Sequence, residues 1–109
     1  MKHVLIIGGT GMLREMSSWV IKQANKTMLI GRNKEKLEQT VPSGYEHKVH
    51  YQFIDYRDTL KLQEGIQHAL EVHGAFDYVI AWIHSSAQLE IRLNVLSITG
   101  GIFRYIFWK

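Results

Sequence analysis

The cluster Gly8-Gly9-Thr10-Gly11 is the part of the chain whose residue types best suit the binding of an anion. It follows the apolar run of residues 3–7 and precedes a helical pattern. Glycine allows a sharp turn and a close approach of a ligand to the backbone. The free N–H groups and the partial positive charge at the start of the next helix attract a phosphate. We therefore predict a phosphate-binding turn made of Gly8, Gly9, Thr10, Gly11, Met12 and Leu13.

A second cluster, Gly31-Arg32-Asn33, indicates which dinucleotide such a turn would hold. An acidic residue about 20 positions beyond the glycines would bind the ribose 2′-hydroxyl of NAD, but here the run ends in Arg32. The forked, permanently charged guanidinium of arginine suits a 2′-phosphate. Arg32 and Asn33 therefore predict NADP, with NAD less favoured. The alternative for Arg32 is an ordinary solvated side chain.

Two later polar clusters would complete the site. Asp55 could accept a hydrogen bond from an adenine amino group beside the backbone of Tyr56, or it could form a turn or cap a helix. His84, Ser85 and Ser86 would border the nicotinamide-side ribose, although the two serines could also cap a helix. Trp82, just before them, is also predicted to bind the cofactor. All four clusters follow predicted strands, which favours one shared ligand site.

The segments that carry these clusters alternate between strands and helices. Apolar, β-branched runs predict strands at residues 3–7, 27–30, 49–54 and 76–82, with amphipathic helices between them. Such alternation implies parallel strands joined by right-handed crossovers. We predict an α/β fold, a three-layer, Rossmann-like, doubly wound parallel sheet of strand order 3-2-1-4. Its ligand is expected outside the carboxyl ends of the first and fourth strands.

Each helix is expected to bury one stripe. In the first helix the predicted core residues recur at helical spacing. They are Leu13, Met16, Val20 and Ala24, with Met12 and Trp19 beside them.

Caps and glycines mark the bounds and contacts of the later helices. Asn33 and Asp58 are predicted N-caps, and Gly74 is a natural stop. Gly65, inside the third helix, is expected to permit a close helix–sheet contact. The third strand is predicted to lie at the edge of the sheet, with one face wetter than the other.

The composition excludes several classes of function. The 109 residues include no cysteine, so disulfide and thiolate chemistry are excluded. The net charge is +3. No apolar stretch reaches the length that suggests a membrane helix, and the basic residues are too scattered to favour nucleic-acid binding. The six histidines lack metal-ligand spacing and are predicted to be titrating surface residues. We expect a cytoplasmic protein without a metal.

Over residues 3–86 the chain resembles the short-chain dehydrogenase/reductase family. The resemblance rests on the glycine turn, on Gly31-Arg32-Asn33, on Asp55, and on Asp77-Tyr78-Val79-Ile80 before the fourth cluster. It implies an NAD(P)-binding Rossmann domain and hydride transfer at a carbonyl or alcohol carbon.

The chain also departs from that family's pattern. Arg14 stands where a third glycine is expected, and Trp82-Ile83-His84-Ser85-Ser86 stands where the family has Asn-Ala-Gly. Family members are more than twice as long, and their catalytic Tyr-x-x-x-Lys lies on a helix. Tyr105 and Lys109 spell that motif, but Ser97 lies only eight positions before Tyr105. We therefore assign no catalytic residue.

The tail, residues 87–109, is predicted to differ from the dinucleotide-binding domain of residues 1–86. Residues 89–95 alternate apolar and polar, and Gly100-Gly101 separates them from the apolar run 102–108, as in a hairpin. We expect a truncated member of the fold that forms a homo-oligomer through this tail or the sheet edge.

Two functions remain open at this point. One is NADP(H) binding with hydride transfer to a carbonyl of an unknown small molecule. The other is a non-catalytic dinucleotide-binding or assembly module that lacks the catalytic half.

Overall fold

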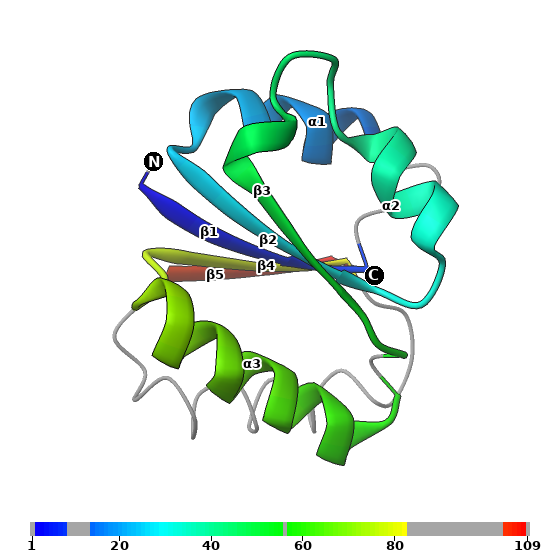
Figure 1. Cartoon of the computed structure of the whole chain (residues 1–109), viewed down its shortest axis with the longest axis vertical. Helices are drawn as coiled ribbons and strands as arrows, with labels where there is room; N and C mark the ends of the chain where they lie inside the picture. Colours follow the sequence, from blue (N-terminus) through cyan, green and yellow to red (C-terminus); the bar gives the residue numbers. More distant parts are fainter. Residues whose placement is uncertain (1, 9–13, 56, 83–103, 109) are drawn as a thin grey trace.

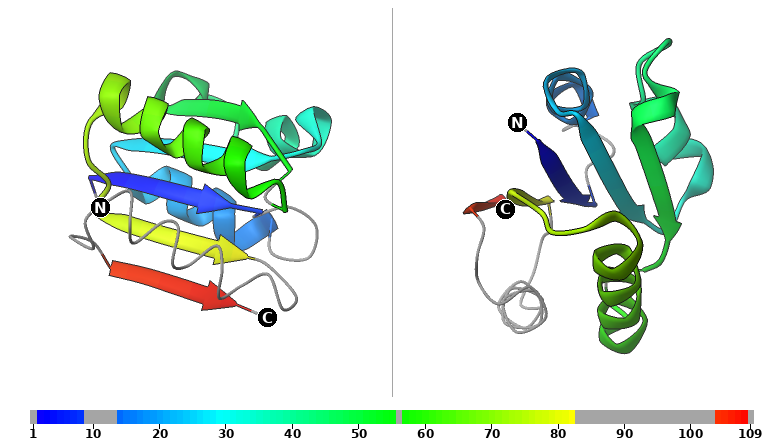
Figure 2. Two further views of the ribbon diagram at one scale, coloured as in Figure 1. Left: turned by 90° about the horizontal axis from the view of Figure 1, so that it is seen from below. Right: turned by 60° about the vertical axis from the view of Figure 1, so that its left-hand side comes forward.

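Five parallel strands form one sheet in the order β3-β2-β1-β4-β5 (Figure 2). The structure is a computed structural model that describes residues 2–8, 14–55, 57–82 and 104–108. The described elements are β1 (His3–Ile7), α1 (Arg14–Gln23), β2 (Lys26–Gly31), α2 (Lys34–Thr40), the 3-10 turn η2 (Glu46–Lys48), β3 (Val49–Phe53), α3 (Thr59–His73), β4 (Tyr78–Trp82) and β5 (Arg104–Trp108). The predicted order 3-2-1-4 is confirmed, and β5 extends the sheet beyond β4.

Helices cover both faces of the sheet (Figure 1). On one face, α1 and α2 pack through Val20, Ile21 and Leu37, and on the other α3 packs through Leu62 and Ile66. All five residues of β1 are buried, because this strand lies between neighbours and under helices on both sides. This explains why its sequence from Val4 to Ile7 is continuously apolar rather than alternating.

The predicted caps and the predicted close contact of α3 are confirmed. The side chain of Asn33 accepts the backbone N–H of Lys36, and that of Asp58 accepts the backbone N–H of Lys61. Gly74 ends α3 at a φ of 86°, a conformation that favours glycine. A Cβ atom on Gly65 would overlap the side chains of Gln52 and Ile54 in their present positions, so α3 lies close to β3 at this glycine.

The predicted core stripe of α1 is partly wrong. Val20 and Ala24 are buried, but the side chains of Met16 and Trp19 are exposed, at 51% and 52%. The buried positions of α1 include Ser17, which has no exposed surface. This small residue faces the sheet in place of Met16, so Met16 and Trp19 lie on the solvent side while Val20 and Ile21 pack against the sheet. Leu13 and Met12 lie outside the described residues.

Two other predictions, about the solvent exposure of the two faces of β3 and of the histidines, also need correction. At the sheet edge, the strand β3 has no clearly wetter face: Tyr51 and Gln52 are both half-buried, because α2 and α3 cover opposite sides. The histidines are not all surface residues, since His3 is only 7% exposed. His50 and His73 stack with their ring centres 4.0 Å apart.

The tail contributes one strand to the sheet, and the sequence predicts this strand but not its pairing with β4. The apolar run 102–108 does contain a strand, Arg104–Trp108, and it pairs with β4 in parallel. Its proposed hairpin partner, residues 89–95, lies outside the described residues, so the hairpin stays a prediction.

Candidate functional site

The carboxyl ends of the strands bring several of the predicted site residues to one edge of the sheet. Gly8 follows β1, Arg32 and Asn33 follow β2, Asp55 lies two residues beyond β3, and Trp82 is the last residue of β4. Two backbone bonds fix neighbouring strand ends, since Gly8 donates to the carbonyl of Ile30 and Ile54 donates to that of Gly31, each at 2.9 Å. Parallel strands all run toward this edge, which is why loops far apart in sequence meet there.

The turn after β1 begins as the sequence predicts. Gly8 has a φ of 74°, in the region that glycine adopts without steric cost. Gly8 lies at the end of β1, between the ends of β2 and β4. From β1 the sheet is extended by β2 and β3 on one side and by β4 and β5 on the other. The other predicted residues of the turn, Gly9, Thr10, Gly11, Met12 and Leu13, lie outside the described residues. So do Tyr56 and His84.

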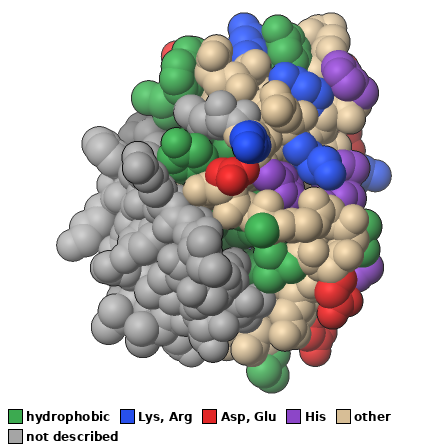
Figure 3. All heavy atoms as spheres, turned by 90° about the vertical axis from the view of Figure 1, so that its left-hand side faces the viewer, with side chains coloured by type: hydrophobic (Ala, Val, Ile, Leu, Met, Phe, Trp, Pro, Cys, Tyr) green, Lys and Arg blue, Asp and Glu red, His purple; other side chains and the backbone are tan. Residues whose placement is uncertain are grey.

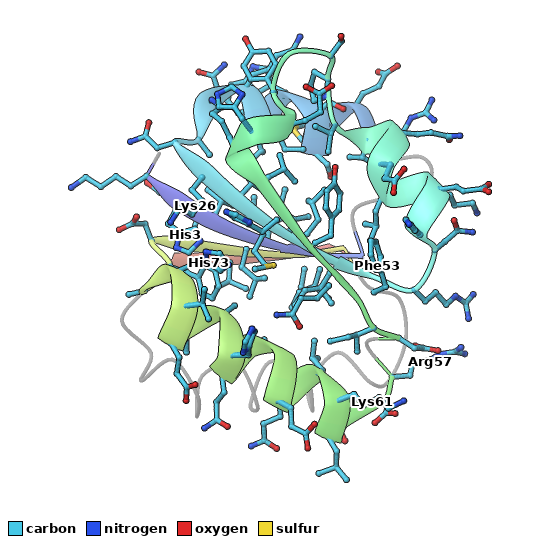
Figure 4. The ribbon with its side chains drawn as sticks, viewed as in Figure 1. His3, Lys26, Phe53, Arg57, Lys61 and His73 are labelled. Carbon is cyan, nitrogen blue, oxygen red and sulfur yellow. The ribbon has the colours of Figure 1, made fainter. Side chains whose placement is uncertain are left out.

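Asp55 contacts two arginines at this edge of the sheet. The backbone N–H and the Nε of Arg57 donate to Oδ1 of Asp55 at 3.0 and 3.1 Å, and the Nη2 of Arg57 donates to Oδ2 at 2.8 Å. The Nη1 of Arg32 lies 3.8 Å from the same Oδ2. Arg57 is labelled in Figure 4, near the end of β3 and the start of α3. The structure thus places Asp55 in a turn, one of its two predicted roles.

These contacts fix the charge of the cluster at neutral pH. Hydrogen bonds from the side chain and backbone of Arg57, together with its charge and that of Arg32, lower the pKa of Asp55 to about 2. The carboxylate is therefore ionised, and two guanidinium groups surround it. The side chains of Arg32 and Arg57 are 70% and 61% exposed to solvent. Such an arrangement can bind an anion from solution.

Asn33 has a structural partner at this edge. Its Oδ1 accepts the backbone N–H of Lys36 at 3.0 Å and so caps α2. The next residue, Lys34, lies with its Nζ 5.9 Å from the ring centre of the exposed Phe53 and 4.0 Å from Oε1 of Glu38. A role for Asn33 in cofactor binding stays a prediction.

Arg57 is the residue of this site that the sequence reasoning missed. A signal for it existed, because Asp55 and Arg57 stand two positions apart in a cluster that follows a strand. An aspartate commonly accepts the backbone N–H two residues later, which brings the intervening turn and the next side chain back toward it.

The motif of Tyr105 and Lys109 does not lie on a helix in the part that the structure describes. Tyr105 belongs to β5 and pairs with Val79 of β4. Lys109 lies outside the described residues. In the family that the sequence resembles, the motif's tyrosine and lysine share a helix face one turn apart, whereas residues four apart on a strand are separated by about 13 Å.

Solved structures share this fold. A short-chain dehydrogenase/reductase from Brucella melitensis, named for glucose/ribitol dehydrogenase, is 14% identical and covers 97% of this chain, at a TM-score of 0.75. A short chain dehydrogenase from Bacillus anthracis is 30% identical over 72% of this chain, at a TM-score of 0.59. ElxO with NADPH bound is 19% identical over 93% of this chain, at a TM-score of 0.63. This chain covers 53%, 34% and 46% of them, respectively.

A curated protein is also similar in sequence. "Probable polyketide synthase 5" of Dictyostelium discoideum is 26% identical over 92% of this chain, which spans 5% of that protein. No protein-family model matches the chain. Among the described residues, none of the helices is long and apolar enough to span a membrane, and no group of three potential metal ligands occurs.

Proposed function

The chain has the Rossmann fold of short-chain dehydrogenase/reductase structures, and from this premise we propose that it binds NADP(H) in an oxidoreductase of that kind. The observation that carries the proposal is the pair of arginines gathered at the carboxyl edge of the sheet, beside the glycine turn. A bound NADPH supplies a hydride for the reduction of a carbonyl. The residues present fit such a ligand, because they offer a close backbone approach and a positive charge at neighbouring loops.

Each described residue has a distinct part in the proposed binding. Gly8 opens the turn that lets a pyrophosphate approach the backbone. Arg32, at the end of β2, contacts the 2′-phosphate that distinguishes NADP from NAD. Asp55 pairs with Arg57 and, through a remaining acceptor site of its carboxylate, accepts a hydrogen bond from the adenine amino group beside the backbone of Tyr56.

A second candidate is a dinucleotide-binding module without catalysis. It is favoured by one observation, the position of Tyr105 on β5 rather than on a helix. The two candidates share the cofactor site and differ in turnover. A panel of carbonyl compounds, with NADPH oxidation followed by absorbance, separates them: turnover that Tyr105→Phe abolishes supports the enzyme, and binding without turnover supports the module.

The binding itself is tested by calorimetric titration with NADPH and with NADH. We expect tighter binding of NADPH, and about 10- to 100-fold weaker NADPH binding in Arg32→Ala with NADH unchanged, since a charge-assisted hydrogen bond contributes about 1.5–3 kcal/mol. Lys36→Ala, which removes an exposed charge from the neighbouring helix α2, is the matched control and should leave both affinities within twofold. Binding of neither nucleotide by the wild-type protein overturns the proposal.

The expected homo-oligomer belongs to the same proposal. The tail or the edge of the sheet would supply the contact, because a strand with an unpaired edge can pair with another chain. Light scattering at micromolar concentration tests this, and a mass equal to one chain removes it. The expected cytoplasmic location stays a prediction of the sequence.

A further inference from the structure

Arg57 is held in place more firmly than an ordinary surface arginine. Its backbone N–H and its Nε share Oδ1 of Asp55, and its Nη2 reaches Oδ2 at 2.8 Å. The guanidinium therefore donates to both carboxylate oxygens, as in a bidentate pair. Because the same carboxylate also closes the turn, the position of the guanidinium is tied to the loop that follows β3.

Arg32 reaches the same oxygen from a different loop. Its Nη1 lies 3.8 Å from Oδ2 of Asp55, so two guanidinium groups from the ends of β2 and β3 converge on one atom. Two cations that share one carboxylate repel each other, and a doubly charged anion bound between them would offset that repulsion. The structure thus brings two cationic side chains from different loops to one carboxylate.

We propose that Arg57 is a second ligand of the cofactor's 2′-phosphate and acts with Arg32 as a two-arginine clamp. This inference rests on the proposed function and adds a residue to it. A phosphate monoester carries nearly two negative charges and three acceptor oxygens, so one group can contact both guanidinium groups at once. NAD presents a hydroxyl at this position and gains nothing from the second arginine.

The alternative for Arg57 is a purely structural salt bridge. An ion pair whose carboxylate is 34% and whose guanidinium is 61% exposed contributes little to folding, because water and salt screen it. The structural role and the ligand role therefore make different predictions. The first affects the stability of the loop equally for both cofactors, and the second changes the ratio of their affinities.

The experiment compares NADPH with NADH in Arg57→Ala and Arg57→Lys. We expect Arg57→Ala to weaken NADPH binding about tenfold and NADH binding less than twofold. Arg57→Lys keeps the charge but loses the fork, and it should recover only part of the loss. Lys61→Ala is the matched control, because it removes a cation from the first turn of α3 near Arg57 (Figure 4) without touching Asp55.

Adenosine 2′,5′-bisphosphate and 5′-AMP serve as a second pair of probes that lack the nicotinamide half. Arg57→Ala should weaken the bisphosphate about tenfold and leave 5′-AMP within twofold. An unchanged NADPH-to-NADH ratio in Arg57→Ala, with the ratio still lost in Arg32→Ala, overturns the inference and leaves the proposed function intact. Failure of the wild-type protein to bind any of these nucleotides overturns the proposed function instead. If Arg57→Ala does not fold, the ratio of NADPH to NADH affinity is measured in Arg57→Lys instead, and an unchanged ratio there overturns the inference.

Discussion

The two edges of the sheet use polar residues in opposite ways. At the carboxyl edge, Arg32 and Arg57 are charged and largely open to water, and they flank the ionised, half-buried Asp55. At the amino edge, histidines and a lysine gather under the end of α3: His3 and Lys26 begin neighbouring strands, and His73 ends the helix (Figure 4). In Figure 3, the view from this side shows histidine and basic side chains clustered over the strand starts.

The histidines of the amino edge serve packing. The Nδ1 of His3 donates to the carbonyl of Ala75 at 2.8 Å, and its ring lies 4.4 Å from that of Phe76. Burial lowers the pKa of His3, and it also lowers the pKa values of His50 and His73. The amino edge therefore holds neutral rings that support the fold, while the carboxyl edge keeps ionised groups that can meet a ligand. The difference shows that polar residues at strand ends indicate a site only where they stay solvated and charged.

The largest expected effect contrasts one residue from each edge. His3→Ala should lower the free energy of unfolding by about 2–4 kcal/mol, because it leaves a cavity beside Phe76 and a carbonyl of Ala75 without its donor. Asp55→Ala should cost less than about 1 kcal/mol, since its ion pairs are exposed. Urea denaturation at pH 7.5 measures both. Equal losses would contradict the contrast between the two edges.

A smaller effect is expected at the bond that ties the start of β1 to the residue before β4. The backbone N–H of His3 donates to Oδ2 of Asp77 at 2.9 Å, and the N–H of Asp77 donates to the carbonyl of His3 at 2.8 Å. Asp77→Ala removes the first of these bonds and should cost about 1 kcal/mol. Asp77→Asn retains an acceptor oxygen and is the control. A loss in Asp77→Asn as large as in Asp77→Ala would show that charge, and not the hydrogen bond, matters.

Much of the fold could be predicted because its causes are local. The apolar run of β1 and the cap residues Asn33 and Asp58 act within a few positions of the chain. Alternation of strands and helices then leaves few topologies, and the order 3-2-1-4 follows. The rotation of α1 could not be predicted, because it depends on Ser17 fitting against the sheet while the larger Trp19 stays outside.

The candidate site was predictable to the level of loops and not of side-chain partners. Arg32 and Asp55 were placed at the same edge because parallel strands end there. That Asp55 would bind Arg57 depends on the rotamers of exposed side chains in a turn, which no periodicity encodes. The burial of His3 could not be predicted for a related reason, since its neighbours Ala75 and Phe76 are more than seventy positions away in the sequence.

The pH dependence of stability near neutrality should come from the amino edge. The folded pKa values of His3, His50 and His73 lie below the ordinary 6.5, so protons bind the unfolded chain more readily. Stability should be constant above about pH 7.5 and fall as the pH drops through about 6.5 toward the folded values. Of the charges that face these rings, those of Lys26 and the neighbouring histidines lower the pKa values further, and burial outweighs the opposing charge of Asp77 beside His3.

His73→Phe provides the test of this pH effect. The ring remains to stack on His50, but one titrating group is lost, so the decline of stability between about pH 7 and 5 should become shallower. The difference between variant and wild type above pH 7.5 gives the packing change and serves as the control. A slope that matches the wild type would mean that His73 titrates alike in both states. The effect should be smaller than that of Asp77→Ala, because His73 is only half-buried.

The smallest expected effect is the loss of folding stability at acid pH that comes from protonation of Asp55 at the carboxyl edge. The folded pKa of Asp55 is about 2, below the ordinary 3.8, so its ion pairs stabilise the fold above about pH 4 and this contribution is lost as the pH falls toward 2. Because the carboxylate is 34% exposed, screening reduces the contribution to less than about 1 kcal/mol. Asp55→Asn should therefore flatten the wild-type decline between pH 4 and 2 only slightly, and 1 M salt should remove the difference. NMR titration of the Asp55 carboxyl measures the pKa directly. A value near 4 would mean that Arg32 and Arg57 do not contact the Asp55 carboxylate in solution. The guanidinium clamp would then have to assemble on the ligand, and the carboxyl edge would lose the preorganised charge that distinguishes it from the packed histidines opposite.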